Sequence, residues 1–372
     1  MRVAFICPSN MLYMPYVENY KEILKQMGVD IQIINWDRFN IEDSSEFVYR
    51  DSKLGHQRGF FDYYKYSKFI TILLKKHNFD RVIIFGVQLT FFMKRILLTN
   101  YSNKFIIDIR DHNKIIKYFN LKKIIDKSDF TVVSSPAYRE WLPKSNKYVI
   151  CHNASLKSLK KTQEFTNLCL PAEKISIGCI GALRDYQVNI DLIDSLMNSD
   201  VIKLNYHGKG DINDNVLRYL DENNIHNVSL TGKYDQAEEK ELYHKNDIIN
   251  VLRYNDDINN KTALPNRLYN AVLYGKPLLG FEGTYLSEVI KEYHLGLVIN
   301  SFINTEGIII DYVNNFNVEI YKKGRKMKKI QYVLLFLCLS ILSNYSFSAQ
   351  NEDEGFLKNT YNDFKYKVSD TW

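Results

Sequence analysis

The sequence predicts an α/β protein made of two doubly wound domains in tandem, and three observations support this expectation. The chain has 372 residues, which is long for one average domain and suits two. In each half, short apolar runs alternate with helical patterns, as is typical of a parallel sheet with helices on both faces. A polar stretch, residues 154–165, interrupts the alternation and is interpreted as a linker.

The expected elements of the first half are six buried strands and three helices. The strands are expected at 3–7, 30–35, 81–85, 104–109, 130–134 and 148–151, and the helices at 17–27, 61–76 and 113–126.

The second half repeats this arrangement. Strands are expected at 175–180, 203–207, 228–231, 248–252, 277–281 and 296–299, and helices at 190–197, 214–223, 237–244, 267–274 and 284–293. Two such domains place a cleft between the carboxyl ends of two sheets, where open α/β sheets bind their ligands.

Composition narrows the possible functions. The chain is 45% hydrophobic and 25% charged, which is the composition of a globular protein. Its net charge of +6 is mild for a nucleic-acid binder, in which a concentrated basic stripe would be expected. No nucleic-acid partner is therefore expected. The five cysteines form no C-x-x-C pair and match no zinc or disulfide framework, which favours a reduced, cytoplasmic setting.

The most informative segment is 261–280, which predicts a loop, a short helix, a glycine stop and a buried strand. Pro265 suits a first helical turn, with Thr262 or Asn266 as possible caps, and Gly275 suits a left-handed C-terminal position. A helix whose first turn faces a cleft offers free N–H groups to a diphosphate. The alternative is an ordinary connection between a helix and a strand.

Three further motifs follow expected strands. Segment 177–186 ends a strand in a loop that carries Arg184. Gly208 and Gly210 form a G-x-G turn after the next strand, and segment 106–113 ends its strand in charged groups.

Together, the domain order and these motifs resemble a GT-B glycosyltransferase of the retaining, family-4-like kind, closest to enzymes of capsular and lipopolysaccharide assembly. The resemblance covers residues 1–320. It implies two Rossmann-like domains facing a cleft, an N-terminal acceptor-side domain over 1–160 and a C-terminal nucleotide-sugar-binding domain over 161–326.

The resemblance also implies a donor site. The family's donor-binding helix normally bears a glutamate that holds the nucleotide ribose; Asn270 stands in its place here, and Thr262 stands where an earlier glutamate is expected. The implied donor-binding residues are Arg184, Gly208, Lys209, Gly210, Leu264, Asn266, Arg267 and Asn270. The alternatives are a solvated loop position for Arg184, an exposed Lys209 and a solvent-facing helix position for Asn270.

For the reacting sugar, the resemblance implies polar contacts from Asp111 and His112, with Arg110 orienting Asp111 or binding phosphate. The alternative is a structural Asp–Arg pair that holds the loop. His152 is a further cleft candidate, against an exposed linker histidine. No D-x-D motif stands in a suitable loop, so neither a catalytic metal nor a cofactor is expected beside the nucleotide diphosphate sugar.

The end of the chain differs in kind. Met327 and two lysines precede an apolar run and the small-residue site 346–349, as in a secretory signal peptide. We expect a hydrophobic signal-peptide-like or anchor segment over 327–349 and a poorly ordered tail over 350–372. It is either a C-terminal membrane-anchoring helix or a second protein fused from another reading frame, and we favour the second.

These expectations combine into one function. The chain is expected to transfer a hexose from a nucleotide diphosphate sugar to a surface-polysaccharide or lipid-linked acceptor, in the cytoplasm, peripheral to or anchored at the inner membrane. The alternatives are an inactive GT-B binding module and an exported envelope protein fragment starting at Met327. A nucleotide-sugar 2-epimerase would need a carboxylate-rich site that the sequence lacks.

Overall fold

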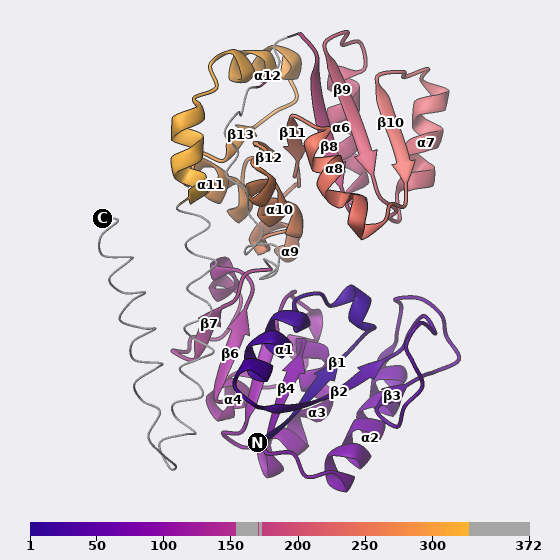
Figure 1. The fold of residues 1–372 in the computed structure, drawn as a ribbon, viewed down its shortest axis with the longest axis vertical. Coiled ribbons are helices and arrows are strands. Elements are labelled where there is room, and N and C mark those ends of the chain that lie inside the picture. Colours follow the sequence, from indigo (N-terminus) through magenta and orange to yellow (C-terminus); the bar gives the residue numbers. More distant parts are fainter. Residues whose placement is uncertain (154–169, 171–172, 327–372) are drawn as a thin grey trace.

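The computed structural model describes residues 1–153, 170 and 173–326, which form two parallel sheets covered by helices (Figure 1). The N-terminal sheet has the order β3-β2-β1-β4-β5-β6-β7. Its strands are β1 (Arg2–Cys7), β2 (Asp30–Trp36), β3 (Val48–Tyr49), β4 (Arg81–Phe85), β5 (Phe105–Ile109), β6 (Phe130–Val133) and β7 (Tyr148–Ile150).

Helices cover both faces of this sheet. On one face, α2 (Phe60–Lys76), α3 (Val87–Asn100) and α4 (Leu121–Lys127) bury an apolar core against the strands. On the other face, α1 (Val17–Gln26) packs Val17, Tyr20 and Ile23 against Phe5 and other strand residues. The strands are nearly continuous apolar runs because both faces are buried.

The second sheet has the order β10-β9-β8-β11-β12-β13. Its strands are β8 (Ile175–Ile180), β9 (Ile202–His207), β10 (Val228–Gly232), β11 (Ile248–Asn250), β12 (Leu278–Phe281) and β13 (Gly296–Ile299). One face is covered by α6 (Tyr186–Leu196), α7 (Asn213–Glu222) and α12 (Thr305–Asn314), and the other by α8 (Glu239–His244), α10 (Asn266–Tyr274) and α11 (Tyr285–Glu292). The expected pair of doubly wound domains is therefore present.

Each sheet has a topological switch point, where the chain reverses its direction of strand addition. It lies between β1 and β4 in the first sheet and between β8 and β11 in the second. The arrowheads of β9 and β10 point toward the N-terminal domain, and α9 (Ile258–Thr262) and α10 lie between the two sheets (Figure 1). Crevices at switch points are the usual ligand sites of such sheets.

Helix α10 ends where its sequence predicts. Gly275 closes it in the left-handed conformation, with φ 69° and ψ 35°. Its start differs from the expectation, because Pro265 occupies the N-cap position in extended conformation and no side chain caps the helix. Leu268 and Ala271 are fully buried, which fixes the inner face of the helix.

Several expected elements differ from the observed ones. The single helix expected over 113–126 is split into a 3-10 turn, Lys114–Tyr118, and α4, because Asn113 and Asn120 each accept a backbone N–H and cap separate turns. Helix α6 begins at Tyr186, four residues before its expected start. β3, α3 and α9 are present without having been predicted from the sequence. Apolar residues lie on several sides of α3, which hides its helical period.

The last described residues pack on the second domain. After α12 the chain leaves its helical path at 315–317 and is helical again over 318–326. Arg325 Nε donates to Val272 O (2.5 Å) and Arg325 Nη2 to Leu273 O (2.8 Å), so the last described turn is tied to the end of α10.

The expected linker over 154–165, the boundary at 160/161, the hydrophobic segment over 327–349 and the tail over 350–372 lie outside the described residues. Within the described ranges, no helix has the length and apolar character needed to span a membrane.

Candidate functional site

The two domains meet through hydrogen bonds made by α9 and α10. Asn259 Oδ1 accepts the backbone N–H of His112 (2.7 Å), and Asn259 Nδ2 donates to His112 O (3.3 Å). Ser135 Oγ donates to Thr262 O (2.6 Å), and Trp141 Nε1 donates to Thr262 Oγ1 (3.2 Å). Thr262, which stands where a glutamate was expected, is therefore buried in the contact between the domains.

His152 takes part in the same contact. Its Nδ1 lies 3.0 Å from the hydroxyl of Tyr269 on α10. Both residues are buried, so His152 belongs to the junction of the domains rather than to an exposed linker.

Arg110 is held inside the N-terminal domain. Its Nε and Nη2 bind the two oxygens of buried Asp108 at 2.6 and 2.7 Å. Its Nη1 donates to Cys151 O (2.7 Å) and Asn153 Oδ1 (2.8 Å), and its guanidinium lies over the ring of Tyr16. The structural Asp–Arg pair that holds this loop is therefore Asp108–Arg110. The guanidinium of Arg110 donates its hydrogen bonds to Asp108, Cys151 and Asn153 and not to Asp111.

Asp111 follows β5 by two residues, is exposed to solvent and lies within the influence of charged groups from both domains. Partial desolvation raises the pKa of Asp111, while Arg184, Arg253 and Arg110 act to lower it. Two of these arginines, Arg184 and Arg253, belong to the second domain, so charges of that domain act on Asp111. His112 lies beside Asp111 with its ring edge-on to Trp141, 5.1 Å between ring centroids. Desolvation lowers the pKa of His112, and Lys117 and Lys114 lower it further.

Arg253 was missed by the sequence reading. It follows β11 by three residues, as Arg184 follows β8 by four, so both flank the β8/β11 switch point. Burial lowers the pKa of Arg253, and the nearby charges of Arg267 and Arg184 lower it further, against Asp185 and Asp111. The signal that could have found it is a basic residue just past a buried strand, the same signal that identified Arg184.

Arg267 has a structural task. Its Nε donates to Ile180 O (2.7 Å) and its Nη2 to Ala182 O (2.8 Å). These bonds tie the first turn of α10 to the end of β8. The positive charge of Arg267 remains at the switch point, but its Nε and Nη2 already donate to these two carbonyls.

The G-x-G turn has a close-packing role. A Cβ on Gly208, whose φ is +136°, would lie 2.0 Å from Gly181 O, and a Cβ on Gly210 would lie 1.9 Å from Leu183 O. Both glycines therefore let the turn pack against the loop that carries Arg184. Lys209 between them is exposed.

The remaining predicted donor residues lie on α10. Leu264 is a core residue, 2% exposed, and Asn266 is exposed in the first turn. Asn270 faces α8, where its Nδ2 donates to Glu239 Oε1 (2.9 Å).

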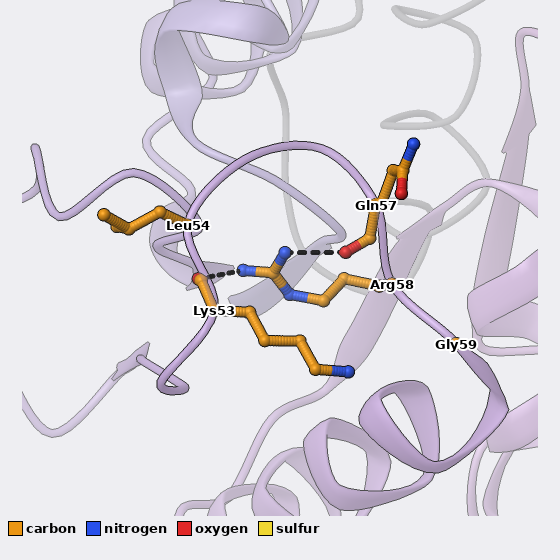
Figure 2. Close-up of a pocket in the computed structure, with 5 residues that line it drawn as sticks. All are labelled: Lys53, Leu54, Gln57, Arg58 and Gly59. Atoms are coloured by element: carbon orange, nitrogen blue, oxygen red, sulfur yellow. Dashed lines mark hydrogen bonds between the residues drawn. The ribbon is translucent and has the colours of Figure 1, made fainter.

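A hollow on the N-terminal domain lies in the loop between β3 and α2. Figure 2 shows its lining, Lys53, Leu54, Gln57, Arg58 and Gly59. Arg58 shapes this loop by donating to the carbonyls of Lys53 (2.6 Å) and Gln57 (2.8 Å).

His56, in the same loop, lies near enough to the second domain for charges of that domain to act on it. Burial lowers the pKa of His56, and Arg38 and Arg184 lower it further, while Asp211 raises it. Because Arg184 and Asp211 belong to the second domain, the hollowed loop borders the cleft opposite them.

The site thus includes the guanidinium groups of Arg184 and Arg253, the carboxylate of Asp111 and the switch-point crevice. Two arginines suit the charge and geometry of a diphosphate. Among residues 1–153, 170 and 173–326, no cluster of His, Cys, Asp or Glu is arranged to hold a metal ion.

Comparison with known proteins supports the fold. No protein-family model matches the sequence, and a search of curated proteins gives no match. Solved structures do match. Sucrose-phosphate synthase from Thermosynechococcus elongatus aligns with a TM-score of 0.70 at 13% identity, covering 94% of this chain and 100% of that one.

Two further matches are the lipopolysaccharide outer core galactosyltransferase WaaB (TM-score 0.63, 15% identity, 94% of this chain and 100% of that chain) and Anabaena HepE in complex with UDP and glucose (TM-score 0.61, 12% identity, 93% and 100%). These likenesses define the class: the chain has the GT-B fold, with two Rossmann-like domains facing each other. At these identities the likeness establishes the fold, and the activity is argued below from the site.

Proposed function

We propose that this protein is a glycosyltransferase that uses a nucleotide diphosphate sugar as donor. The observation that carries the proposal is the placement of Asp111 after β5 of the first domain and of Arg184 and Arg253 after β8 and β11 of the second, at the carboxyl ends of strands in a GT-B fold. The arginines stabilise the diphosphate that leaves, because fixed charges at a developing negative charge lower the barrier. Asp111 binds hydroxyls of the sugar that is transferred.

The acceptor is proposed to be a surface glycan or a lipid-linked saccharide. WaaB is named as a lipopolysaccharide galactosyltransferase, and HepE was solved with UDP and glucose. The loop that carries His56 borders the cleft on the N-terminal side, and we propose that it contacts the acceptor.

We further propose that transfer retains the anomeric configuration. The resemblance to retaining, family-4-like enzymes supports this, because donor phosphate oxygens can help to deprotonate the acceptor without a protein nucleophile. The anomer of the product, read by NMR, tests this, and an inverted product would contradict it.

The inactive binding module is the second candidate, because Thr262 and Asn270 stand where carboxylates were expected. The full chain should be incubated with UDP-, GDP- and CMP-sugars while thermal stabilisation and release of nucleotide are followed. Stabilisation with nucleotide release supports the transferase. Stabilisation without release, with any acceptor tried, supports the binding module, and the absence of any stabilisation contradicts both.

A further inference from the structure

Asn260 joins the two loops that carry the arginines of the donor site. Its side-chain Nδ2 donates to Asp185 Oδ1 (3.2 Å) and to Asp256 Oδ1 (3.1 Å). Asp185 directly follows Arg184 in the loop after β8, and Asp256 lies three residues beyond Arg253 in the loop after β11. One amide group therefore connects both arginine-bearing loops.

The orientation of this amide is dictated by its two partners. A carboxylate only accepts hydrogen bonds, so an amide between two carboxylates turns its nitrogen toward both, and that nitrogen has two N–H groups, one for each. Asn260 is 9% exposed, and its backbone N–H donates to Asp257 Oδ1 (3.0 Å), which caps α9. The side chain that forms the bridge is thus buried, and its backbone is held by the capping residue.

The loop after β8 has a conformation that needs such support. Asp185 is left-handed, with φ 59° and ψ 63°, which is uncommon for a residue other than glycine. The buried Asn189 side chain donates from Nδ2 to Arg184 O (2.8 Å) and to Asp185 O (2.8 Å). Asn189 thus holds the backbone of this loop, and Asn260 holds the carboxylate next to Arg184.

Repulsion between the arginines acts against this arrangement. Burial lowers the pKa of Arg253, and the charges of Arg267 and Arg184 lower it further, so the guanidinium groups are close enough to repel one another. In the part of the chain that the structure describes, neither Arg184 nor Arg253 donates a side-chain hydrogen bond. Their separation therefore depends on the loops that carry them, which the Asn260 side chain holds together.

We propose that Asn260 is a positioning residue that sets the spacing of Arg184 and Arg253 and thereby makes the site selective for a nucleoside diphosphate over a monophosphate. Two phosphate groups engage both guanidinium groups at once, whereas a single phosphate gains less from the second. Asn260 acts through Asp185 and Asp256. The inference rests on the proposed function, because it requires a nucleotide at the carboxyl ends of β8 and β11.

Titration calorimetry on the full chain tests the proposal with UDP and UMP, and with GDP and GMP. In the pair that binds, the wild type should prefer the diphosphate by about tenfold or more, because it gains a second charge-assisted contact. Asn260→Ala should reduce this preference to within about threefold, mainly through lost diphosphate affinity. Asn223→Ala is the control, since it removes an exposed asparagine side chain at the end of α7, and it should keep the wild-type preference.

Two substitutions of Asp256 separate the bridge from the charge. Asp256 is exposed, so both variants are expected to fold. Asp256→Asn and Asp256→Ala remove the same charge, but only asparagine keeps a side-chain oxygen that accepts from Asn260. Asp256→Asn should therefore show a preference for the diphosphate about threefold larger than that of Asp256→Ala, the effect of one hydrogen bond.

The outcomes distinguish this inference from the proposed function. Equal weakening of both nucleotides by Asn260→Ala would show a merely structural role and overturn the inference. An unchanged preference in that variant, or a wild type without a preference, would overturn it as well and leave nucleotide binding in place. If Asn260→Ala does not fold, the two Asp256 variants decide, and equal preferences in them overturn the inference. Failure of the wild type to bind any of the four nucleotides contradicts the proposed function itself.

Discussion

The side-chain amide of Asn259 binds both backbone groups of His112 across the two domains, at 2.7 Å to the N–H and 3.3 Å to the carbonyl. This contact fixes His112, the neighbour of Asp111, relative to α9 and α10 of the second domain. The separation between Asp111 and the arginines therefore depends on this contact.

Asn259→Ala should lower kcat/KM for transfer by about threefold to thirtyfold, the cost of one or two lost hydrogen bonds. Affinity for the nucleotide alone should change less, because its proposed contacts lie on the second domain. Lys261→Ala is a suitable comparison, since Lys261 joins Glu140 across the domains in an exposed ion pair of little expected value. Equal losses in the two variants would contradict a special role for Asn259.

Low pH should destabilise the loop that follows β2, because protonation of Asp37 removes the charge that its hydrogen-bond partners stabilise. Burial alone would raise the pKa of Asp37, but hydrogen bonds from Asn10, Arg50 and the amides of Ile41 and Glu42 lower it to about 2. The folded pKa lies below the ordinary value of 3.8, so the stabilisation is fully present above pH 4 and is lost as pH falls toward 2. The Asp37 side chain is fully buried, so the contribution is of the order of 2 kcal/mol.

Urea unfolding at two pH values measures this contribution. Asp37→Asn should destabilise the protein by about 2 kcal/mol at pH 6 and by roughly half as much at pH 3. Exposed Asp200 provides the control, because its amide variant should behave as wild type at both values. A destabilisation by Asp37→Asn that is independent of pH would show that lost packing, not charge, is responsible.

Association with an anionic membrane is proposed for the start of α2. Phe60 and Phe61 are 58% and 76% exposed there, Leu54 is 71% exposed, and Lys53 lies beside them in the loop. Exposed aromatic groups next to a cation suit an interface with anionic lipid. Such a surface would bring the loop that borders the cleft close to a lipid-linked acceptor.

Lipid quenching distinguishes this surface from other contacts. In vesicles containing brominated phosphatidylglycerol, Phe61→Trp should add a quenched tryptophan signal, whereas Ile303→Trp, at an 80% exposed site on the second domain, should add an unquenched one. Binding to the vesicles with Phe61→Trp left unquenched would exclude this face, and no binding would exclude the association.

The sequence predicted much of the fold because both sheets are parallel and buried on both faces. Strands such as β4 and β12 then stand out as apolar runs, and Gly275 marks the end of α10 through its left-handed backbone. Helix α3 was missed because apolar residues lie on several of its sides.

The site was predicted less completely, since its key relations join distant parts of the chain. Arg110 looked available for chemistry until the fold placed it against Asp108 and Cys151. Asn270 looked available to a ligand until the fold placed its amide against Glu239, 31 residues away in the chain. Local patterns identify such residues as charged but cannot show which ones converge.

The central claim is that a donor diphosphate lies at the carboxyl ends of β8 and β11. It is tested most directly by calorimetry with Arg253→Ala and Arg184→Ala, using UDP or GDP, whichever binds, and the matching nucleoside, with exposed Arg218→Ala as control. Each of the two variants should lose about tenfold or more in affinity for the nucleoside diphosphate, and nucleoside affinity should stay within about twofold of wild type. Unchanged diphosphate affinity in both variants would contradict the account.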